Sequence, residues 1–283
     1  MKAVVIGAEG QLGTEICNVY SDVELRRVNH SDLDVRDGAC VRTYLGELRP
    51  QVVINTAAMH NLPDCEEDPE TAFAVNAIGA KNVAQACSEY GTRFVHVSTD
   101  YVFGDNGSQP FVEDDLPNAL NIYGTSKLAG EHLVAAHCTD SAIVRTGAIY
   151  GSAPCRAKSG KNFVGLMLHL ATTRPEVKVK TDEFITPTYT VPLARQIRLI
   201  AERGKPGIYH ATCNGSCSWY DFAKAIFEET GTEANLLPAT NDDFPSSIRR
   251  PLYSVLENRR LKEQGLDIMP QWREALTSYI ETL

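Results

Sequence analysis

The chain has 283 residues, of which 43% are hydrophobic and 22% are charged, a composition that supports a full core and excludes disordered and fibrous proteins. Its formal net charge is −9 and no run of like charge forms a tail, so nucleic acid is not an expected partner. No apolar stretch approaches the roughly 18 residues of a membrane span, and the first residues enter a strand directly, so we expect a cytoplasmic protein without a membrane partner.

Apolar, β-branched runs alternate with helical patterns through the first half of the chain. In chain order the expected strands are residues 2–7, 23–28, 51–57, 93–99 and 142–150, and the expected helices are residues 11–20, 41–48, 71–90 and 123–136. The runs at Val4–Ile6 and Val52–Ile54 are continuously hydrophobic, as in parallel strands covered on both faces. The pattern predicts an α/β fold with a doubly wound parallel sheet of the Rossmann type.

The second half of the chain is less regular. Residues 151–160 are rich in small, proline and basic residues, and helices are expected at 163–171, 193–203 and 219–229. We therefore predict a dinucleotide-binding Rossmann domain at residues 1–150. Residues 151–283 are predicted to form a smaller C-terminal substrate lobe, part of which returns to the sheet.

The cysteines are scattered through a chain too long to need disulfide staples. They are Cys17, Cys40, Cys65, Cys87, Cys138, Cys155, Cys213 and Cys217. The last two have a spacing within the range of zinc ligands, but no second Cys or His pair lies near them in the sequence. We expect free thiols and no metal site.

The first strand runs directly into the segment GAEGQLG, a glycine-rich turn that opens a helix. It contains Gly7, Gly10 and Gly13, with Gln11 and Leu12 at the start of the helix. Glycines allow a tight turn and a close approach of the backbone, and the helix N-terminus offers unpaired N–H groups to a pyrophosphate. Because the turn follows the first strand of an alternating chain, it predicts binding of NADPH or NADH, and its spacing suggests a short-chain reductase.

The end of the second strand bears on the choice between the two cofactors. Asn29, His30 and Ser31 occupy the point where an acidic residue would bind the ribose 2′-hydroxyl of NADH. This favours NADPH slightly, although Asp32 and Asp34 follow closely.

Four further residues are candidates for cofactor contacts. Asp34 and Val35 are interpreted as an adenine contact, the alternative being an ordinary turn before the next helix. Ala57 and Ala58 end the third strand, where small residues let a cofactor lie against the backbone.

Tyr123 and Lys127 in YGTSK are spaced i, i+4 on an expected helix, so both project from one face. An ammonium group beside a phenol favours its ionised form, which suits Tyr123 to act as a general acid. Thr99 ends the strand FVHVST and is expected to polarise a substrate carbonyl at the same sheet edge. The three residues are predicted to form a catalytic group, although Tyr-x-x-x-Lys alone is more often two surface residues.

No zinc-protease, nucleophile-elbow or P-loop motif is present. Five of the seven histidines are interpreted as ordinary helix, strand or loop residues. They are His60, His96, His132, His137 and His169.

These residues resemble the extended short-chain dehydrogenase/reductases, and within them the dTDP-4-dehydrorhamnose reductase family. The likeness covers nearly the whole chain and rests on GAEGQLG, VINTAA, VNAIGAKNVAQAC, STDYVFGDNG, YGTSKLAGE, RRPLYSVLEN and PQW, in that order. The resemblance implies hydride transfer from NADPH or NADH to C4 of a nucleotide-linked 4-keto-6-deoxy sugar. Thr99, Tyr123 and Lys127 match the family's catalytic positions.

The resemblance also implies a set of substrate contacts. Asp100 and Tyr101 match positions beside the sugar, although each could equally hold the strand-end loop. Asn162 and Phe163 resemble the start of the substrate lobe. Arg250 resembles the family's Arg-Pro element and is a bidentate candidate for the substrate diphosphate, the alternative being a solvated charge.

The chain departs from the family pattern at two positions. Ala148 stands where the family usually has a tryptophan, and Ile185 stands at a usual glycine. A related nucleotide sugar or a different C4 epimer is therefore an open alternative. Trp219 matches the family, but its helical spacing with Phe222 favours a place in the core.

Two other readings of the chain stay open at this point. The same family resembles the non-catalytic β subunit of methionine adenosyltransferase, so a regulatory NADP-binding subunit is an alternative to an enzyme. Some relatives are homodimers with a bridging magnesium ion, for which Glu15 is a possible ligand. An ordinary helical glutamate is the simpler interpretation, and we expect no metal.

Overall fold

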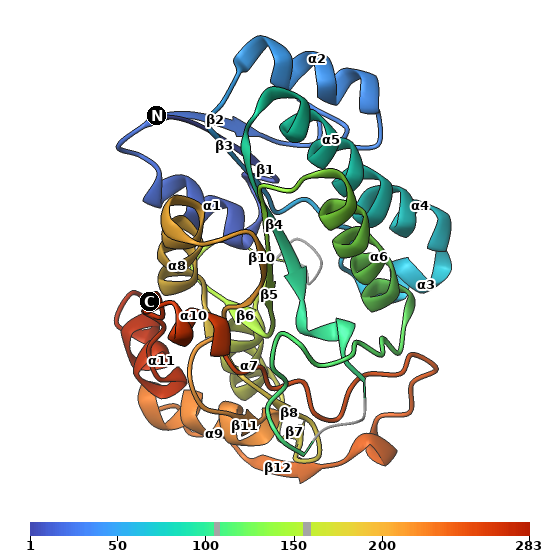
Figure 1. Cartoon of the computed structure of the whole chain (residues 1–283). Coiled ribbons are helices and arrows are strands. Elements are labelled where there is room, and N and C mark those ends of the chain that lie inside the picture. Colours follow the sequence, from blue (N-terminus) through green and yellow to red (C-terminus); the bar gives the residue numbers. More distant parts are fainter. Residues whose placement is uncertain (105–107, 155–159) are drawn as a thin grey trace.

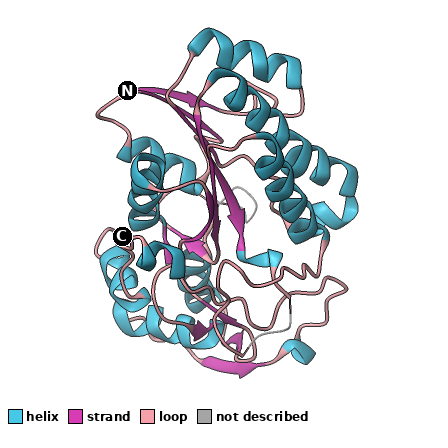
Figure 2. Cartoon of the chain, viewed as in Figure 1, coloured by secondary structure: helices cyan, strands magenta, loops and turns pink. Residues whose placement is uncertain are grey.

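The computed structural model describes residues 1–104, 108–154 and 160–283. A six-stranded sheet forms its centre, in the order β10-β5-β4-β3-β1-β2, and every pairing is parallel (Figures 1 and 2). The strands are β1 (Lys2–Ile6), β2 (Glu24–Val28), β3 (Val52–Asn55), β4 (Arg93–Thr99), β5 (Ser141–Thr146) and β10 (Gly207–His210). The predicted doubly wound parallel sheet is confirmed.

Helices cover both faces of this sheet (Figure 1). One face carries α1 (Gln11–Val19) and α8 (Thr190–Arg203), and the other carries α2 (Gly38–Leu48), α5 (Ala80–Tyr90) and α6 (Ile122–His137). Successive residues of a strand point to opposite faces. Accordingly Val5 packs in the cluster that contains Ile197 of α8, whereas Val4 packs with Val41 of α2.

The expected helix at residues 71–90 is three consecutive elements. It begins with α4 (Pro69–Phe73), continues as a π-helical segment η1 (Ala74–Gly79) and ends as α5. A short helix α3 (Leu62–Glu67) precedes it. The π-helical segment carries Asn76, whose side chain is fully buried between two parts of the site described below.

The rest of the described chain forms short strands, 3-10 turns and further helices outside the central sheet. They are η2 (Asp100–Val102), β6 (Ile149–Tyr150), α7 (Phe163–Thr173), β7 (Val177–Lys180), β8 (Phe184–Ile185), β9 (Thr188–Tyr189), β11 (Cys217–Ser218), α9 (Trp219–Thr230), β12 (Leu236–Ala239), η4 (Asn241–Asp243), α10 (Arg259–Glu263) and α11 (Trp272–Ile280). The small strands pair as β6–β9, β7–β12 and β8–β11. None of the helices formed by described residues is long and apolar enough to cross a membrane.

Two elements that follow Gly151 belong to the Rossmann part of the fold: one is a strand of the central sheet and the other is a helix on one of its faces. Strand β10 pairs with β5, with Tyr209 opposite Val144, and α8 packs against α1. One continuous core cluster includes residues from both sides of Gly151, such as Ile16 and Tyr279. The two halves of the chain therefore share a core.

Candidate active site

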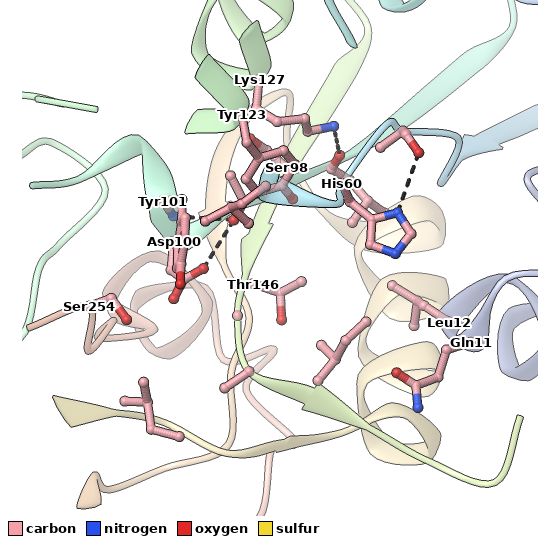
Figure 3. A pocket seen from close by; sticks show the side chains of 18 of the residues that line it. Gln11, Leu12, His60, Ser98, Asp100, Tyr101, Tyr123, Lys127, Thr146 and Ser254 are labelled. Atoms are coloured by element: carbon pink, nitrogen blue, oxygen red, sulfur yellow. Dashed lines mark hydrogen bonds between the residues drawn. The ribbon is translucent and has the colours of Figure 1, made fainter. Parts of the chain in front are cut away.

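A cavity of about 310 Å³ lies at the carboxyl ends of the central strands (Figure 3). After β1 the chain builds β2 on one side and then crosses to β3 on the other, and such switch points are where ligands bind in open α/β sheets. The lining comprises residues 10–13, 97–101 and 146–149 together with Thr56, Ala58, His60, Leu62, Tyr123, Lys127, Asn162, Phe163, Glu183, Ile185, Trp219, Pro251 and Ser254.

The glycine turn forms one end of the cavity, and its geometry leaves no room for side chains. Gly7 has φ +81°, and a Cβ on Gly13 would lie 2.2 Å from the Gly7 carbonyl oxygen. Gly10 is the N-cap of α1 and makes no side-chain cap hydrogen bond. The helix therefore presents backbone N–H groups at a close-packed turn, which fits the diphosphate of a dinucleotide. Gly10, Gln11, Leu12 and Gly13 line the cavity; Gly7 shapes the turn behind them.

Three of the other cofactor candidates, Asp34, Val35 and Ala57, lie outside this lining. Asp34 pairs with Arg36 at 2.6 Å, and that guanidinium lowers the carboxyl pKa to about 2. Val35 is buried. Ala57 donates its backbone N–H to Asn55 Oδ1 at 3.0 Å, whereas Ala58 faces the cavity. The adenine contact of Asp34 and Val35 stays a prediction.

Thr99, Tyr123 and Lys127 all line the cavity, and Figure 3 shows Tyr123 and Lys127 next to each other. Thr99 is the last residue of β4, and the other two lie one turn apart on α6. Helix α6 can approach this strand end because residue 124 is glycine; a Cβ there would lie 2.1 Å from the Tyr101 carbonyl oxygen. The structure thus brings the three sequence-predicted catalytic residues together.

Lys127 is almost fully buried, and its ammonium faces the sheet. Its Nζ donates a hydrogen bond to the Val97 carbonyl oxygen at 2.7 Å and lies 3.4 Å from His96 Nε2. Burial lowers the pKa of Lys127 to about 8, while the carboxylate of Glu131 acts in the opposite direction. Lys127 therefore titrates within an accessible pH range.

Burial is the main influence on the pKa of Tyr123. Desolvation raises it above its usual value; a hydrogen bond with Thr99 lowers it, and the charge of Asp100 raises it. Lys127 is not among the causes of the shift. The Lys127 ammonium is directed at the Val97 carbonyl, and its expected direct effect on the phenol stays a prediction.

Asp100 is buried next to Thr99. Its Oδ1 accepts a hydrogen bond from Thr99 Oγ1 at 3.0 Å, and Ser254 also hydrogen-bonds it. Burial raises its pKa to about 6 despite these hydrogen bonds. The carboxyl packs on Gly147, where a Cβ would lie 2.3 Å from the Asp100 carboxyl carbon. Tyr101 lines the cavity and packs edge-on against Tyr123, with 6.0 Å between ring centroids.

The candidate substrate residues of the C-terminal half differ in how they lie around the cavity. Asn162 lines the cavity, but its side chain caps α7 through Gly165 N (2.9 Å) and donates to Gly151 O (2.7 Å). Phe163 packs on Trp219 with ring centroids 4.5 Å apart, and both form cavity wall. Trp219 stands at the start of α9 and is half-buried: it packs against the core, as expected, and also faces the cavity.

Arg250 is half-buried and lies outside the cavity lining, next to Pro251, which is part of it. Its positive charge acts on the Tyr101 phenol and lowers the pKa of that group against the effect of burial. Arg250 is thus within electrostatic reach of the cavity, and its diphosphate contact stays a prediction.

Both residues that depart from the family pattern face the cavity. Ala148 has φ +46°, a left-handed conformation that non-glycine residues rarely adopt. Ile185 is buried in β8 and adds apolar surface. The two departures therefore lie in the wall of the pocket.

Several lining residues were missed by sequence reasoning. Thr146 ends β5 and His60 follows β3, so their strand-end positions were a usable signal. Glu183 and Ser254 come from the irregular second half, and no local pattern marks them. Glu183 pairs with Lys180 at 2.6 Å.

The described residues contain no group of three or more His, Cys, Asp or Glu side chains that could hold a metal ion. Glu15 Oε2 accepts a hydrogen bond from Asn18 at 3.2 Å on the same helix. The seven described cysteines are free thiols, and Cys155 lies outside the described residues.

Comparison with known proteins places this site in a family. The family model described as the RmlD substrate binding domain matches residues 1–283. A crystal structure of a dTDP-4-dehydrorhamnose reductase from Clostridium acetobutylicum is 41% identical, with a TM-score of 0.95 over 100% of this chain and 99% of that one. The chain belongs to the dTDP-4-dehydrorhamnose reductase family.

Two further members of the comparison add detail on the family. The dTDP-4-dehydrorhamnose reductase of Bacillus anthracis, crystallised in complex with NADP, is 33% identical, with a TM-score of 0.94 over 100% of this chain and 99% of that one. The spore coat polysaccharide biosynthesis protein SpsK of Bacillus subtilis is 40% identical over 99% of this chain and 97% of its own length. Membership of this reductase family makes the chain an oxidoreductase.

Proposed function

We propose that the protein uses NADPH to reduce the C4 carbonyl of a nucleotide-linked 4-keto-6-deoxy sugar, converting dTDP-4-dehydro-L-rhamnose to dTDP-L-rhamnose. One observation carries the proposal. One cavity is lined by the glycine turn at α1, by Thr99, Tyr123 and Lys127, and by Asp100 and Ser254, and Figure 3 shows Tyr123 and Lys127 between Gln11 of the turn and Asp100. Cofactor and sugar can therefore meet at the catalytic group.

The cofactor end fits a nicotinamide dinucleotide by its own geometry. Gly10 and Gly13 leave the N–H groups of α1 open toward the diphosphate, and Ala58 leaves space for the cofactor beside β3. The B. anthracis relative was crystallised with NADP, which supports NADP(H) over NAD(H). When bound, the reduced nicotinamide supplies the hydride for the carbonyl carbon.

The chain's own residues supply the proton and the orientation. Tyr123 Oη donates a proton to the substrate oxygen, so that the carbonyl becomes a secondary alcohol. Thr99 hydrogen-bonds the same phenol and holds the substrate oxygen in line with it. Lys127, one turn further on α6, binds the nicotinamide-side ribose.

At the sugar end, hydroxyl groups and apolar surface face each other. Asp100 and Ser254 form hydrogen bonds with sugar hydroxyls, while Phe163 and Trp219 form an apolar wall. Arg250, beside this end, pairs with the nucleoside diphosphate. These assignments follow from the positions of the residues around the cavity and are tested by the substrate specificity of the enzyme.

The deciding experiment follows NADPH absorbance when the purified protein meets enzymatically prepared dTDP-4-dehydro-L-rhamnose, with the product identified by NMR. Oxidation of NADPH with formation of dTDP-L-rhamnose is the expected result. Tight NADPH binding without turnover on any nucleotide-linked 4-keto sugar would contradict the proposal and favour the regulatory-subunit alternative, which a pull-down of a larger partner would then test.

A second candidate substrate is supported by the pocket wall. Ala148 and Ile185 both face the cavity and differ from the residues usual in the family. A dTDP-4-keto-6-deoxy sugar of different ring stereochemistry is the alternative that this difference favours. Comparing kcat/KM for the two epimers, in the wild type and in Ala148→Trp, separates the candidates.

A further inference from the structure

His60 lines the cavity, yet the mechanism above does not use it. It lies in the loop that follows β3, two residues after Ala58, and its side chain is exposed. Figure 3 shows its ring between Lys127 on one side and Leu12 and Gln11 on the other. A cofactor that runs from the glycine turn to the catalytic group has to pass this imidazole.

The loop that presents His60 is held in place from both sides of its backbone. The side chain of Asn76 accepts a hydrogen bond from Met59 N and donates one to Met59 O, each at 2.9 Å. The same amide donates to Ser126 Oγ at 2.9 Å, and Ser126 Oγ donates to the Tyr123 carbonyl oxygen at 2.8 Å. Met59, the residue before His60, is thus connected through Asn76 to Ser126 of the catalytic helix.

The element that carries Asn76 is unusual in itself. Asn76 is fully buried within the π-helical segment η1, and such segments occur frequently at functional sites. Gly130 of α6 packs directly on this segment, since a Cβ there would lie 2.3 Å from the Asn76 carbonyl oxygen. The position of His60 relative to α6 is therefore preorganised, which lowers the cost of ordering it on binding.

The charges around the cavity indicate a role for His60 at this position. A dinucleotide carries two negative charges on its diphosphate, and the N-terminus of α1 supplies only partial positive charge. Among the described residues that line the cavity, the basic side chains are Lys127 and His60. Lys127 is buried and donates to Val97 O, whereas His60 is exposed beside the glycine turn.

We propose that His60 donates a ring N–H hydrogen bond to the diphosphate of the bound cofactor, opposite the N-terminus of α1. The imidazole then closes the diphosphate between a side chain of the β3 loop and the backbone of the glycine turn. This inference rests on the proposed use of NADPH, but it concerns binding and does not depend on the identity of the sugar.

Equilibrium binding of NADPH, followed by its fluorescence, tests the inference. His60→Ala is expected to raise the Kd for NADPH about tenfold, as for the loss of one charge-assisted hydrogen bond. His60→Lys, which keeps a hydrogen-bond donor at this position, is expected to return the Kd to within about threefold of wild type. His169→Ala removes an exposed histidine of α7 outside the cavity lining and serves as the matched control.

A cofactor fragment adds a readout that a merely structural role would not give. Adenosine 2′-monophosphate contains the adenine half but neither phosphate of the diphosphate bridge, so its Kd should be equal in the wild type and His60→Ala. A wild-type Kd for NADPH in His60→Ala would overturn the inference. So would an equal loss of affinity for the fragment, or a His60→Lys variant as weak as His60→Ala, because either result indicates altered packing.

The outcome is independent of the proposed reaction. A chain that binds NADPH through His60 but reduces no nucleotide sugar would contradict the proposed function and leave this inference standing. A chain that forms dTDP-L-rhamnose, and in which His60→Ala binds NADPH as the wild type does, would contradict this inference alone.

Discussion

The chemistry of the site rests on single side chains placed at the ends of regular elements. Tyr123 has one hydrogen-bonding hydroxyl, which contacts Thr99, and its ring packs against Tyr101. The hydroxyl can therefore be removed with little effect on the packing of α6. Its role as the proton donor can be tested separately from its role in the fold.

Tyr123→Phe is expected to lower kcat for carbonyl reduction by at least about 100-fold, because general acid catalysis contributes about 10²–10⁴. The Kd for NADPH should stay within about twofold of wild type, since the ring remains. Steady-state kinetics and a fluorescence titration measure the two quantities. Turnover close to wild type would remove Tyr123 from the mechanism.

Lys127 gives the reaction a predicted pH dependence. Its pKa is lowered from 10.5 to about 8 by burial, so the ammonium is present below about pH 8 and is lost above it. In the proposed mechanism the protonated Lys127 donates a hydrogen bond to the nicotinamide-side ribose and so positions the cofactor for hydride transfer. We expect kcat to be level below pH 8 and to fall about tenfold per pH unit above it.

The control for this profile is Lys127→Met. Its residual kcat should be low and should not show the limb near pH 8. A wild-type profile that stays level up to pH 10, where an ordinary lysine begins to lose its proton, would contradict the assignment of the limb to Lys127.

At the scale of elements, a buried ion pair fixes α6 against the sheet. Arg145 of β5 and Glu131 of α6 are each 2% exposed and lie 2.7 Å apart between Nη2 and Oε2. Ser98 of β4 donates a hydrogen bond to the same carboxylate. The pair therefore joins two central strands to the helix that carries Tyr123 and Lys127.

Arg145→Met leaves the Glu131 carboxylate buried without its partner, so we expect the free energy of unfolding to fall by about 3–5 kcal/mol. Adding Glu131→Gln should recover part of the loss, because the unpaired charge is then removed. Arg273→Ala breaks an exposed pair with Glu228 and is expected to cost less than about 1 kcal/mol. Urea denaturation compares the variants; equal effects of Arg145→Met and Arg273→Ala would contradict the argument.

At the scale of the whole molecule, the cofactor half of the chain is incomplete without the second half. Strand β10 extends the sheet beyond β5, and α8 covers the face of the sheet that also carries α1. The side chains of Leu193, Ile197 and Ile200 on α8 are fully buried. A chain that ended near Gly151 would expose the apolar surface they cover.

We therefore expect a fragment of residues 1–150 to lack a cooperative urea transition by circular dichroism, whereas the full chain shows one. The physical reason is that one face of its sheet would be open to water. Cooperative unfolding of the fragment, with NADPH binding retained, would show instead that the first half is an independent domain.

The sequence by itself determined the alternating α/β fold, the glycine turn and the pairing of Tyr123 with Lys127. These features are set by local rules: strand hydrophobicity, the steric freedom of glycine and the i, i+4 spacing of a helix act over a few residues. Thr99 was also within reach, because parallel strands end at one sheet edge.

Only the tertiary structure decided what else surrounds that centre. Glu183, Trp219 and Ser254 reach the cavity through packing between segments far apart in the chain, and no local pattern encodes such contacts. The π-helical turn that ties the His60 loop to α6 was likewise hidden in an ordinary helical periodicity. Lys127 shows the same division: its position followed from spacing, whereas its lowered pKa depends on burial that the whole fold creates.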